Sequence, residues 1–246
     1  MDNATYVALS RQLILKRELD VTANNIANMN TNGFKFEELL VKTDPAAGAR
    51  NDPIRTPTNF ALDHGVGRDF SQGAMSKTGN PFDLALQTNG VFFSLAGPNG
   101  TRLLTRNGSF TMGPDGTLQT QNGLKVQGDG GDIVIDPKKP APSIAADGTI
   151  SQGTDIVGKI SLVRVTNLSA LSKQGDGNFS LPASITPQAA TDGQVAQGFV
   201  ESSNVNPLKE ITHLVEINRS YTTIANIISQ NQDMNESAIN RLGKAA

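Results

Sequence analysis

Two histidines and a short series of aspartates are the residues of this chain that could carry catalytic or metal chemistry. His64 lies in a loop-like stretch and His213 in a predicted helix, and neither has a nucleophile or a metal ligand at a diagnostic spacing. Asp129, Asp132 and Asp136 resemble a calcium-binding loop, but the ligand order and the terminal glutamate of that loop are missing, which favours turn residues. We therefore predict that the chain is not an enzyme and binds no metal or other cofactor.

The composition argues against several classes of partner. Lys and Arg total 21 against 23 Asp and Glu, so the net charge of -2 creates no general attraction to nucleic acid or anionic lipid. The sequence has neither a GxxxxGKS/T loop nor a GxGxxG motif at a strand-to-helix junction, which are common signs of nucleotide binding. The lack of cysteine removes disulfides and thiolate catalysis. We see no signal-peptide pattern and no run of about 20 apolar residues, so we expect no membrane insertion.

The first predicted element is an amphipathic helix over residues 3–31. Its apolar residues recur at helical spacing and are Tyr6, Leu9, Leu13, Leu15, Leu19 and Ile26. The helix ends in the sequence ANNIANMNTNG, in which asparagine lowers helix propensity. Gly33 can adopt the left-handed conformation just after the last turn, and Phe34 is placed for the hydrophobic contact that accompanies it.

The middle of the chain has the pattern of strands and turns. Residues 35–80 contain Pro45, Pro53 and Pro57 and few paired strand patterns, which predicts an extended connector with short strands. From residue 81 to residue 200, short apolar runs alternate with Asn-Gly and Asp-Gly turn signals. This region is predicted to be a meandering antiparallel β domain, and its longest predicted strand covers residues 159–165. The fold class is therefore mainly β with terminal α-helices.

A second long helix is predicted from Pro207 to residue 242, with Ser202, Ser203 and Asn204 as capping candidates. A strict 3-4 repeat gives it a set of coiled-coil core positions, namely Ile211, Leu214, Asn218, Tyr221, Ala225, Ile228, Gln232, Asn235, Ile239 and Leu242. An apolar strip beside the repeat consists of Ile217, Ile224, Ile227 and Met234. At about 1.5 Å per residue this helix is roughly 54 Å long, too long to pack on one small β domain. The apolar stripes of the two helices must meet each other, the β region or other copies, and we favour the last two together.

Carboxamide side chains crowd the end of the first helix and recur in the second. They include Asn24, Asn25, Asn28, Asn30, Asn32, Asn218, Gln232 and Asn235. Buried carboxamides are costly unless they are paired, yet they can fix the register of neighbouring helices. Composition alone favours the simpler interpretation, in which they cap and solvate the helices.

Several stretches of the chain resemble the flagellar rod and hook family. They are ANNIANMNTNGFK from Ala23, GFVESSNVNPLKEITHLVEINRSY from Gly198, and, between these two, TGNPFDLALQTNGVFF and LTRNGSFTMGPDGTLQT. The resemblance implies that the N- and C-terminal helices pair as a coiled coil, with the antiparallel β domain inserted between them in the chain. It also implies that they stack with the helices of other subunits around a central channel, which makes the asparagines interface residues.

The resemblance divides the chain into four expected regions. These are an N-terminal helix of the axial coiled-coil domain (1–34), the connector (35–80), the β domain (81–200) and a C-terminal helix of the axial domain (201–246). The residues expected at subunit interfaces are Leu9, Leu13, Leu19, Asn24, Asn25, Ile26, Asn28, Asn32, Gly33, Phe34, Ile211, Leu214, Asn218, Tyr221, Ile228, Asn235 and Leu242.

The function implied by the resemblance is mechanical. A structural subunit of the rod would join a hollow drive shaft in the flagellar basal body. This shaft would span the periplasm, transmit torque and let exported subunits pass. The start MDNATYVALS and the lack of large insertions look most like a proximal-rod member, and a distal-rod paralogue is the nearest alternative. The implied partners are other rod proteins, further copies of this chain in a helical assembly, and the flagellar type III export apparatus. A secreted β-domain adhesin or binding module, oligomerised by its helices into a closed bundle, is the alternative from another class.

Overall fold

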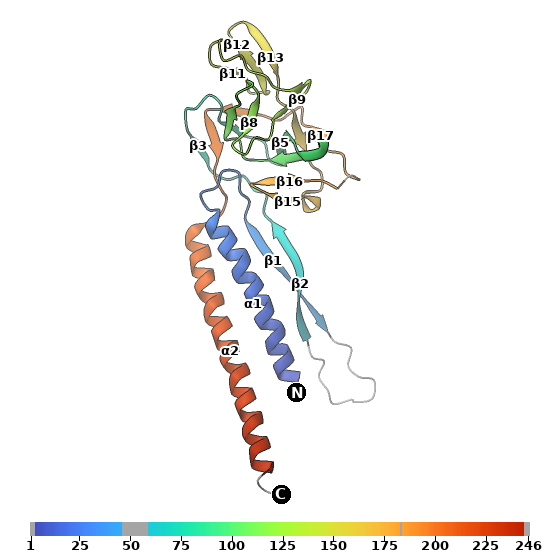
Figure 1. Cartoon of the computed structure of the whole chain (residues 1–246), viewed down its shortest axis with the longest axis vertical. Coiled ribbons are helices and arrows are strands. Elements are labelled where there is room, and N and C mark those ends of the chain that lie inside the picture. The colour runs from blue at the N-terminus through green and yellow to red at the C-terminus, as the bar shows by residue number, and fades with distance from the viewer. Residues whose placement is uncertain (1–2, 46–58, 183, 244–246) are drawn as a thin grey trace. The chain divides into compact units, whose positions relative to one another are not determined.

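The computed structural model describes residues 3–45, 59–182 and 184–243. The fold is mainly β with a helix at each end of the chain, as the sequence predicts (Figure 1). The chain divides into two compact units. The helical unit comprises the described parts of residues 1–27, 37–68 and 206–246, and the β unit comprises those of residues 28–36 and 69–205.

The helical unit contains two helices and one β-hairpin. α1 (Asn3–Ala27) and α2 (Pro207–Gly243) lie side by side, and the hairpin packs along α1 (Figure 1). The hairpin consists of the antiparallel strands β1 (Glu37–Pro45) and β2 (Asn59–Arg68). One side of α1 supplies most of the buried side chains of this unit, namely Ile14, Leu15, Val21, Thr22 and Asn25. α1 is therefore the central element against which α2 and the hairpin pack.

The hairpin differs from the sequence prediction. Residues 35–80 were expected to form an extended connector with short strands, but β1 and β2 are the longest strands among the described residues, with 9 and 10 residues. A register shift between Leu39 and Val41 breaks the apolar–polar alternation of β1. Gly65 and Gly67 interrupt the alternation of β2. These two irregularities hide the strands from a search for a period of two residues.

The end of α1 is also earlier than predicted. The helix ends at Ala27 rather than near residue 31, and residues 28–36 belong to the β unit. Gly33 adopts the expected left-handed conformation, with a φ of 71°. It does not terminate the helix, however, because it lies beyond the helix end. A Cβ atom on Gly33 would lie 2.4 Å from the backbone nitrogen of Asn107, so the glycine permits a close approach of two chain segments.

The main sheet of the β unit has six antiparallel strands in the order β15-β16-β6-β5-β14-β17. Their bounds are β5 (Val91–Ala96), β6 (Arg102–Thr105), β14 (Leu162–Arg164), β15 (Ser172–Gly175), β16 (Asn178–Ser180) and β17 (Gln188–Ala189). The antiparallel β structure predicted for residues 81–200 is therefore confirmed in this part of the chain. The predicted long strand 159–165 is wrong, because β13 ends at Lys159 and β14 begins at Leu162.

Smaller sheets complete the β unit. A three-stranded sheet joins β11 (Ser143–Ile144), β12 (Thr149–Gln152) and β13 (Asp155–Lys159). The two-stranded ribbons are β7 (Phe110–Met112) with β8 (Leu118–Thr120), β9 (Gln127–Gly128) with β10 (Gly131–Asp132), β4 (Leu84–Leu86) with β18 (Val195–Gln197), and β3 (Met75–Lys77) with β19 (Phe199–Glu201). Two short 3-10 turns cover Pro98–Gly100 and Leu168–Ala170.

β5 lies between two hydrophobic clusters. Phe93 belongs to the larger cluster and packs edge-on against Phe110, with ring centroids 5.1 Å apart. Phe92 points to the other face, where it packs against Phe70 and Phe179 at 5.8 Å and 6.3 Å. A strand that is buried on both faces needs apolar side chains at successive positions. This explains why β5 begins with three successive apolar residues, Val91, Phe92 and Phe93, instead of an alternating pattern.

Candidate functional site

The structure gives the candidate catalytic and metal-binding residues ordinary structural surroundings. The Nε2 atom of His213 lies 3.0 Å from Oε1 of Glu18, an exposed pair that joins α2 to α1. Asp132 accepts hydrogen bonds from Lys125 and Gln127, and these bonds lower the pKa of its carboxyl group. Within the described residues, no group of three or more histidine, aspartate or glutamate side chains could hold a metal ion. In the same part of the chain, no helix is long and apolar enough to cross a membrane.

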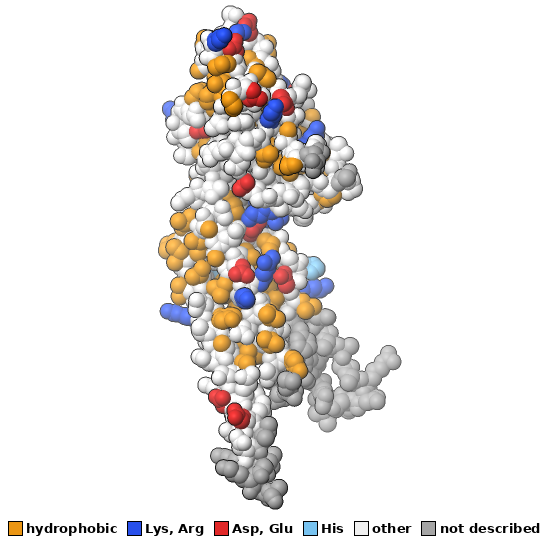
Figure 2. Space-filling view, in the orientation of Figure 1, with side chains coloured by type: hydrophobic (Ala, Val, Ile, Leu, Met, Phe, Trp, Pro, Cys, Tyr) orange, Lys and Arg blue, Asp and Glu red, His pale blue; other side chains and the backbone are white. Residues whose placement is uncertain are grey.

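The outer side of α1 carries exposed apolar side chains. Tyr6, Leu9 and Leu13 are 47%, 45% and 60% exposed. They are spaced by three and four residues, which places them on one side of the helix, away from the buried Ile14 and Leu15. Figure 2 shows hydrophobic side chains gathered over the helical unit. This side of α1 is a partly exposed apolar surface.

α2 has an apolar surface of the same kind near its first turns. Leu208, Ile211 and Val215 are 76%, 49% and 42% exposed and follow the same spacing of three and four residues. Further along the helix, Ile227 and Met234 are exposed as well. We call the sets Tyr6–Leu9–Leu13 and Leu208–Ile211–Val215 the α1 triplet and the α2 triplet. Monomeric proteins rarely leave such groups open unless they form an interaction site.

The side of α2 that faces α1 follows a 3-4 spacing, but in a register that differs from the predicted one. Its buried and half-buried residues are Glu210, Leu214, Ile217, Tyr221, Ile224, Ala225, Ile228 and Asn231. Ile217 was expected in the flanking strip, yet it is only 4% exposed, whereas Ile211 and Asn218 of the predicted repeat are exposed. Within one chain, Ile217 and Ile224 therefore lie on the seam between the helices, and Asn218 does not.

The other predicted interface residues fall into three groups. Leu19, Ile26, Asn28 and Asn32 are half-buried, and Leu214, Tyr221 and Ile228 are half-buried on the seam. Asn24 and Asn235 are exposed. Gly33 and Phe34 are buried inside the β unit, where the Nζ atom of Lys173 lies 4.8 Å from the centre of the Phe34 ring. Leu242 belongs to α2, but its side chain lies outside the described residues.

Asn25 joins three elements of the helical unit. Its side-chain nitrogen donates to the Glu37 backbone oxygen at 2.8 Å and to Oε2 of Glu210 at 3.0 Å. Its side-chain oxygen accepts from the Glu37 backbone nitrogen at 3.0 Å. Glu37 in turn pairs with Nε of Arg68 at 2.8 Å. The buried carboxamide thus connects α1, β1 and α2 of the same chain, and its partners Glu37 and Glu210 could not be identified from the sequence.

A buried cluster of three charged residues lies in the β unit. The Nζ atom of Lys35 lies 2.6 Å from Oε1 of Glu201, and Nε of Arg106 donates to Oε2 of Glu201 at 2.8 Å. The three residues are 2%, 0% and 2% exposed in the order Lys35, Glu201 and Arg106. Burial lowers the pKa of Lys35 from its ordinary value of 10.5, although Glu201 acts to raise it. Sequence reasoning missed this cluster, although each of its members lies in a stretch that carries the family resemblance.

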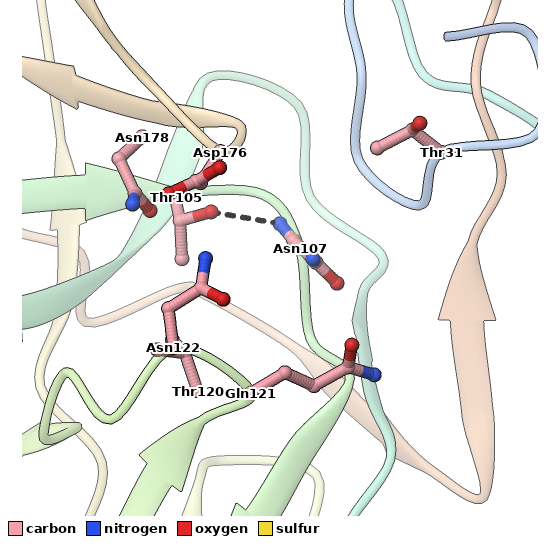
Figure 3. Close-up of a pocket in the computed structure, with 8 residues that line it drawn as sticks. All are labelled: Thr31, Thr105, Asn107, Thr120, Gln121, Asn122, Asp176 and Asn178. Carbon is pink, nitrogen blue, oxygen red and sulfur yellow. Dashed lines mark hydrogen bonds between the residues drawn. The ribbon is translucent and has the colours of Figure 1, made fainter.

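A polar cavity of about 160 Å³ lies elsewhere in the β unit (Figure 3). Its lining consists of Thr31, Thr105, Asn107, Thr120, Gln121, Asn122, Asp176 and Asn178. The backbone nitrogen of Asn107 donates to Oγ1 of Thr105 at 3.1 Å, and every residue of the lining has a polar side chain. The cavity is polar and large enough for ordered water, which would satisfy such groups. Its lining has no histidine, cysteine or serine that could act as base or nucleophile.

Comparisons with known proteins identify the family. Residues 6–35 match the family described as flagella basal body rod protein, residues 85–152 the flagellar hook protein FlgE/F/G D1 domain, and residues 196–242 the flagellar basal body rod FlgEFG protein C-terminal family. The flagellar basal-body rod protein FlgF of Caulobacter vibrioides is 47% identical over 245 residues, which cover 99% of each chain. The chain belongs to the flagellar basal-body rod protein family.

Two further relatives show the range of this rod family. The FlgF protein of Mesorhizobium japonicum is 36% identical to this rod-family chain, and the match covers 99% of both. The FlgG protein of Buchnera aphidicola subsp. Baizongia pistaciae is 33% identical, and the match covers 88% of this chain and 90% of that protein. The relatives named FlgF therefore match over almost their whole length, and the family resemblance predicted from the sequence is confirmed.

The three matched segments meet inside the β unit. Lys35 lies in the first segment, Arg106 in the second and Glu201 in the third. The rod-family chain thus brings residues from each matched segment into one buried ionic cluster, whereas its exposed apolar triplets lie in the helical unit.

Proposed function

We propose that this chain is a structural, non-enzymatic subunit of the flagellar basal-body rod, of the FlgF type. The full-length relatives named FlgF and the order of the three matched segments support this assignment. The observation that carries it is the apolar surface of the helical unit. Leu9 and Leu13 of α1 and the α2 triplet lie away from the seam between the helices and are exposed enough to contact other subunits.

The exposed triplets make assembly favourable only when several of them are covered together. Full burial of a leucine or isoleucine side chain contributes roughly 1.5–3 kcal/mol. Bringing two molecules together costs an estimated 4–15 kcal/mol in lost freedom of motion. One covered side chain cannot offset that cost, whereas two triplets covered by neighbours can. The surface therefore favours an assembly in which each subunit contacts several others.

We propose in addition that the two helices form a coiled coil whose outer faces contact neighbouring copies and other rod proteins. α2 has 37 residues and α1 has 25, so at about 1.5 Å per residue α2 is roughly 18 Å longer. The extra length leaves the last turns of α2 without α1 beside them, free to reach another subunit (Figure 1). Among the described residues, Leu9, Leu13 and Ile211 are the predicted interface residues that are both apolar and exposed.

The family resemblance supports the remaining parts of the proposal. The rod would be a hollow shaft that spans the periplasm, transmits torque and lets exported subunits pass, and the flagellar type III export apparatus would deliver the chain to it. The relatives named FlgF favour the proximal rod, and the FlgG relatives make the distal rod the alternative position.

Charged substitutions in the triplets test the proposal. Leu13→Asp and Ile211→Asp are expected to leave the chain folded by circular dichroism but to abolish its incorporation into purified basal bodies. Ile156→Asp is the control, because Ile156 is 76% exposed but lies on β13 of the β unit. Wild-type incorporation of Leu13→Asp would contradict the proposed surface.

A secreted β-domain adhesin or binding module would instead form a closed oligomer of fixed mass. Sedimentation of the purified chain with and without FlgG separates the two classes. A rod subunit is expected to form larger assemblies in a concentration-dependent way when FlgG is present. A single defined oligomer under both conditions would favour the adhesin class.

A further inference from the structure

The chain passes between its two units at four points, which follow residues 27, 36, 68 and 205. Hydrogen bonds inside the β unit tie the segments at three of these points together. The Asp69 backbone nitrogen donates to the Phe36 oxygen at 2.9 Å, and the Phe36 nitrogen donates to Oδ1 of Asn204 at 2.7 Å. Nδ2 of Asn204 donates to the Asp69 oxygen at 2.9 Å. Residues near 36, 69 and 204 therefore form one hydrogen-bonded group.

The buried charges extend this group. Besides Glu201, Nζ of Lys35 donates to the Ser71 oxygen at 2.6 Å. Oε1 of Glu201 accepts from the Gly73 backbone nitrogen at 3.0 Å. The Gly33 backbone nitrogen donates to the Glu201 backbone oxygen at 2.7 Å. The same three segments that meet at Asn204 are thus joined a second time through Glu201.

Arg106 holds the cluster to the main body of the β unit. Its NH1 atom donates to the Thr88 and Val91 backbone oxygens at 2.8 Å and 2.7 Å. Its Nε atom donates to Glu201. Because Val91 begins β5 of the main sheet, Arg106 connects Glu201 with the sheet that carries the hydrophobic core.

Stability alone does not account for a cluster of this kind. Replacing a buried ionic group by apolar residues of similar volume is often neutral or stabilising, because the charges must first lose their hydration. Charged hydrogen bonds at 2.6–2.8 Å have strict geometry, however, so they fix the relative positions of the chain segments that they join.

We propose that Lys35, Arg106, Glu201 and Asn204 are positioning residues for rod assembly and form a crossing clamp. The clamp holds the chain segments that lead into and out of the helical unit at fixed points on the β unit. β1 begins at Glu37, close after Lys35, and α2 begins at Pro207, close after Asn204. This inference rests on the proposed function, since incorporation into the rod is the property that the clamp would support.

Lys35→Met tests the clamp. The substitution removes one of two cations and leaves Arg106 and Glu201 as a balanced pair, so the melting temperature is expected to stay near that of the wild type. The loss of two charged hydrogen bonds is expected to raise amide exchange at Gly33 and Phe36 about tenfold, with the Phe93 amide unchanged. Incorporation into basal bodies, measured in a strain that lacks the wild-type gene, is expected to fall by a similar factor.

Lys125→Met and Asn204→Ala complete the experiment. Lys125 also pairs with an aspartate but lies at the surface, so its substitution is expected to change neither amide exchange at Gly33 nor incorporation. Asn204→Ala keeps every buried charge and removes only hydrogen bonds. If Lys35→Met does not fold, Asn204→Ala therefore shows whether incorporation depends on the clamp. Wild-type incorporation of Asn204→Ala and of any folded Lys35→Met overturns the clamp. Failure of the wild type and Lys125→Met to incorporate would instead count against the proposed function.

Discussion

Leu95 of the β unit and Leu13 of the helical unit show how differently the two parts of the chain place their apolar side chains. Leu95 is 0% exposed and belongs to the larger hydrophobic cluster, whereas Leu13 is 60% exposed on α1. The β unit covers most of its apolar side chains with its own residues, although Val134 and Ile156 are exposed. The helical unit leaves the α1 and α2 triplets exposed on its two helices. The β unit therefore encloses a hydrophobic core, whereas the helical unit presents the apolar surface that the proposed assembly requires.

The two units also differ in the polar groups that they bury. The β unit buries Lys35, Arg106 and Glu201, which carry full charges and are held by hydrogen bonds to one another and to backbone oxygens. The helical unit buries the carboxamide of Asn25, which joins α1 to β1 and α2, together with the carboxylates of Glu37 and Glu210. Buried charges are costly unless they are paired, and Glu201 is the shared counter-charge of two buried cations. Loss of Glu201 is therefore expected to cost most.

Glu201→Ala is expected to have the largest effect on stability. The substitution leaves Lys35 and Arg106 buried without a counter-charge, and breaking a buried ion pair in this way costs about 3–5 kcal/mol. The free energy of unfolding from urea titration measures the loss. Glu236→Ala on the exposed part of α2 is the control and is expected to change this free energy by less than about 0.5 kcal/mol. Equal losses in the free energy of unfolding for Glu201→Ala and Glu236→Ala would show that the buried charges of the β unit contribute no more to stability than an exposed glutamate.

Leu95→Ala and Leu13→Ala make the same chemical change in the two units. Leu95→Ala is expected to lower the free energy of unfolding by about 2–5 kcal/mol, because it leaves a cavity in the core. Leu13→Ala is expected to change it by less than about 0.5 kcal/mol in the isolated chain, because the side chain is largely solvated there. Both values come from urea titration of the monomer. A large loss for Leu13→Ala would show that the α1 triplet is already covered.

Features that depend on neighbouring residues could be predicted from the sequence. The terminal helices follow from apolar spacing of three and four residues, and the β turns follow from Asn-Gly and Asp-Gly pairs. The clamp could not be predicted in this way, because Lys35 and Arg106 reach Glu201 across 166 and 95 residues. Only the resemblance of the separate stretches to one family indicated that these parts of the chain act together.

The seam of α2 shows a second limit of the sequence. Two 3-4 repeats that share Leu214, Tyr221 and Ile228 both fit its apolar pattern, one through Asn218 and one through Ile217. The structure buries Ile217 against α1 and exposes Asn218. The partner helix decides between the registers, and a sequence taken alone does not contain that partner's position. The predicted register remains a hypothesis for contacts with other subunits, which one chain does not test.

Gly33→Ala tests whether the segment that follows α1 depends on the β unit for its conformation. A left-handed conformation at a residue other than glycine costs about 1–3 kcal/mol, and the added Cβ would also meet the backbone of Asn107. Gly123→Ala is the matched control, because Gly123 has a φ of 80° with nothing near the position of its Cβ. The difference between the two losses in the free energy of unfolding therefore isolates the close contact with Asn107. If Gly33→Ala loses no more than Gly123→Ala, the segment can move away from Asn107, and its position is less fixed than the hydrogen bonds of the clamp require.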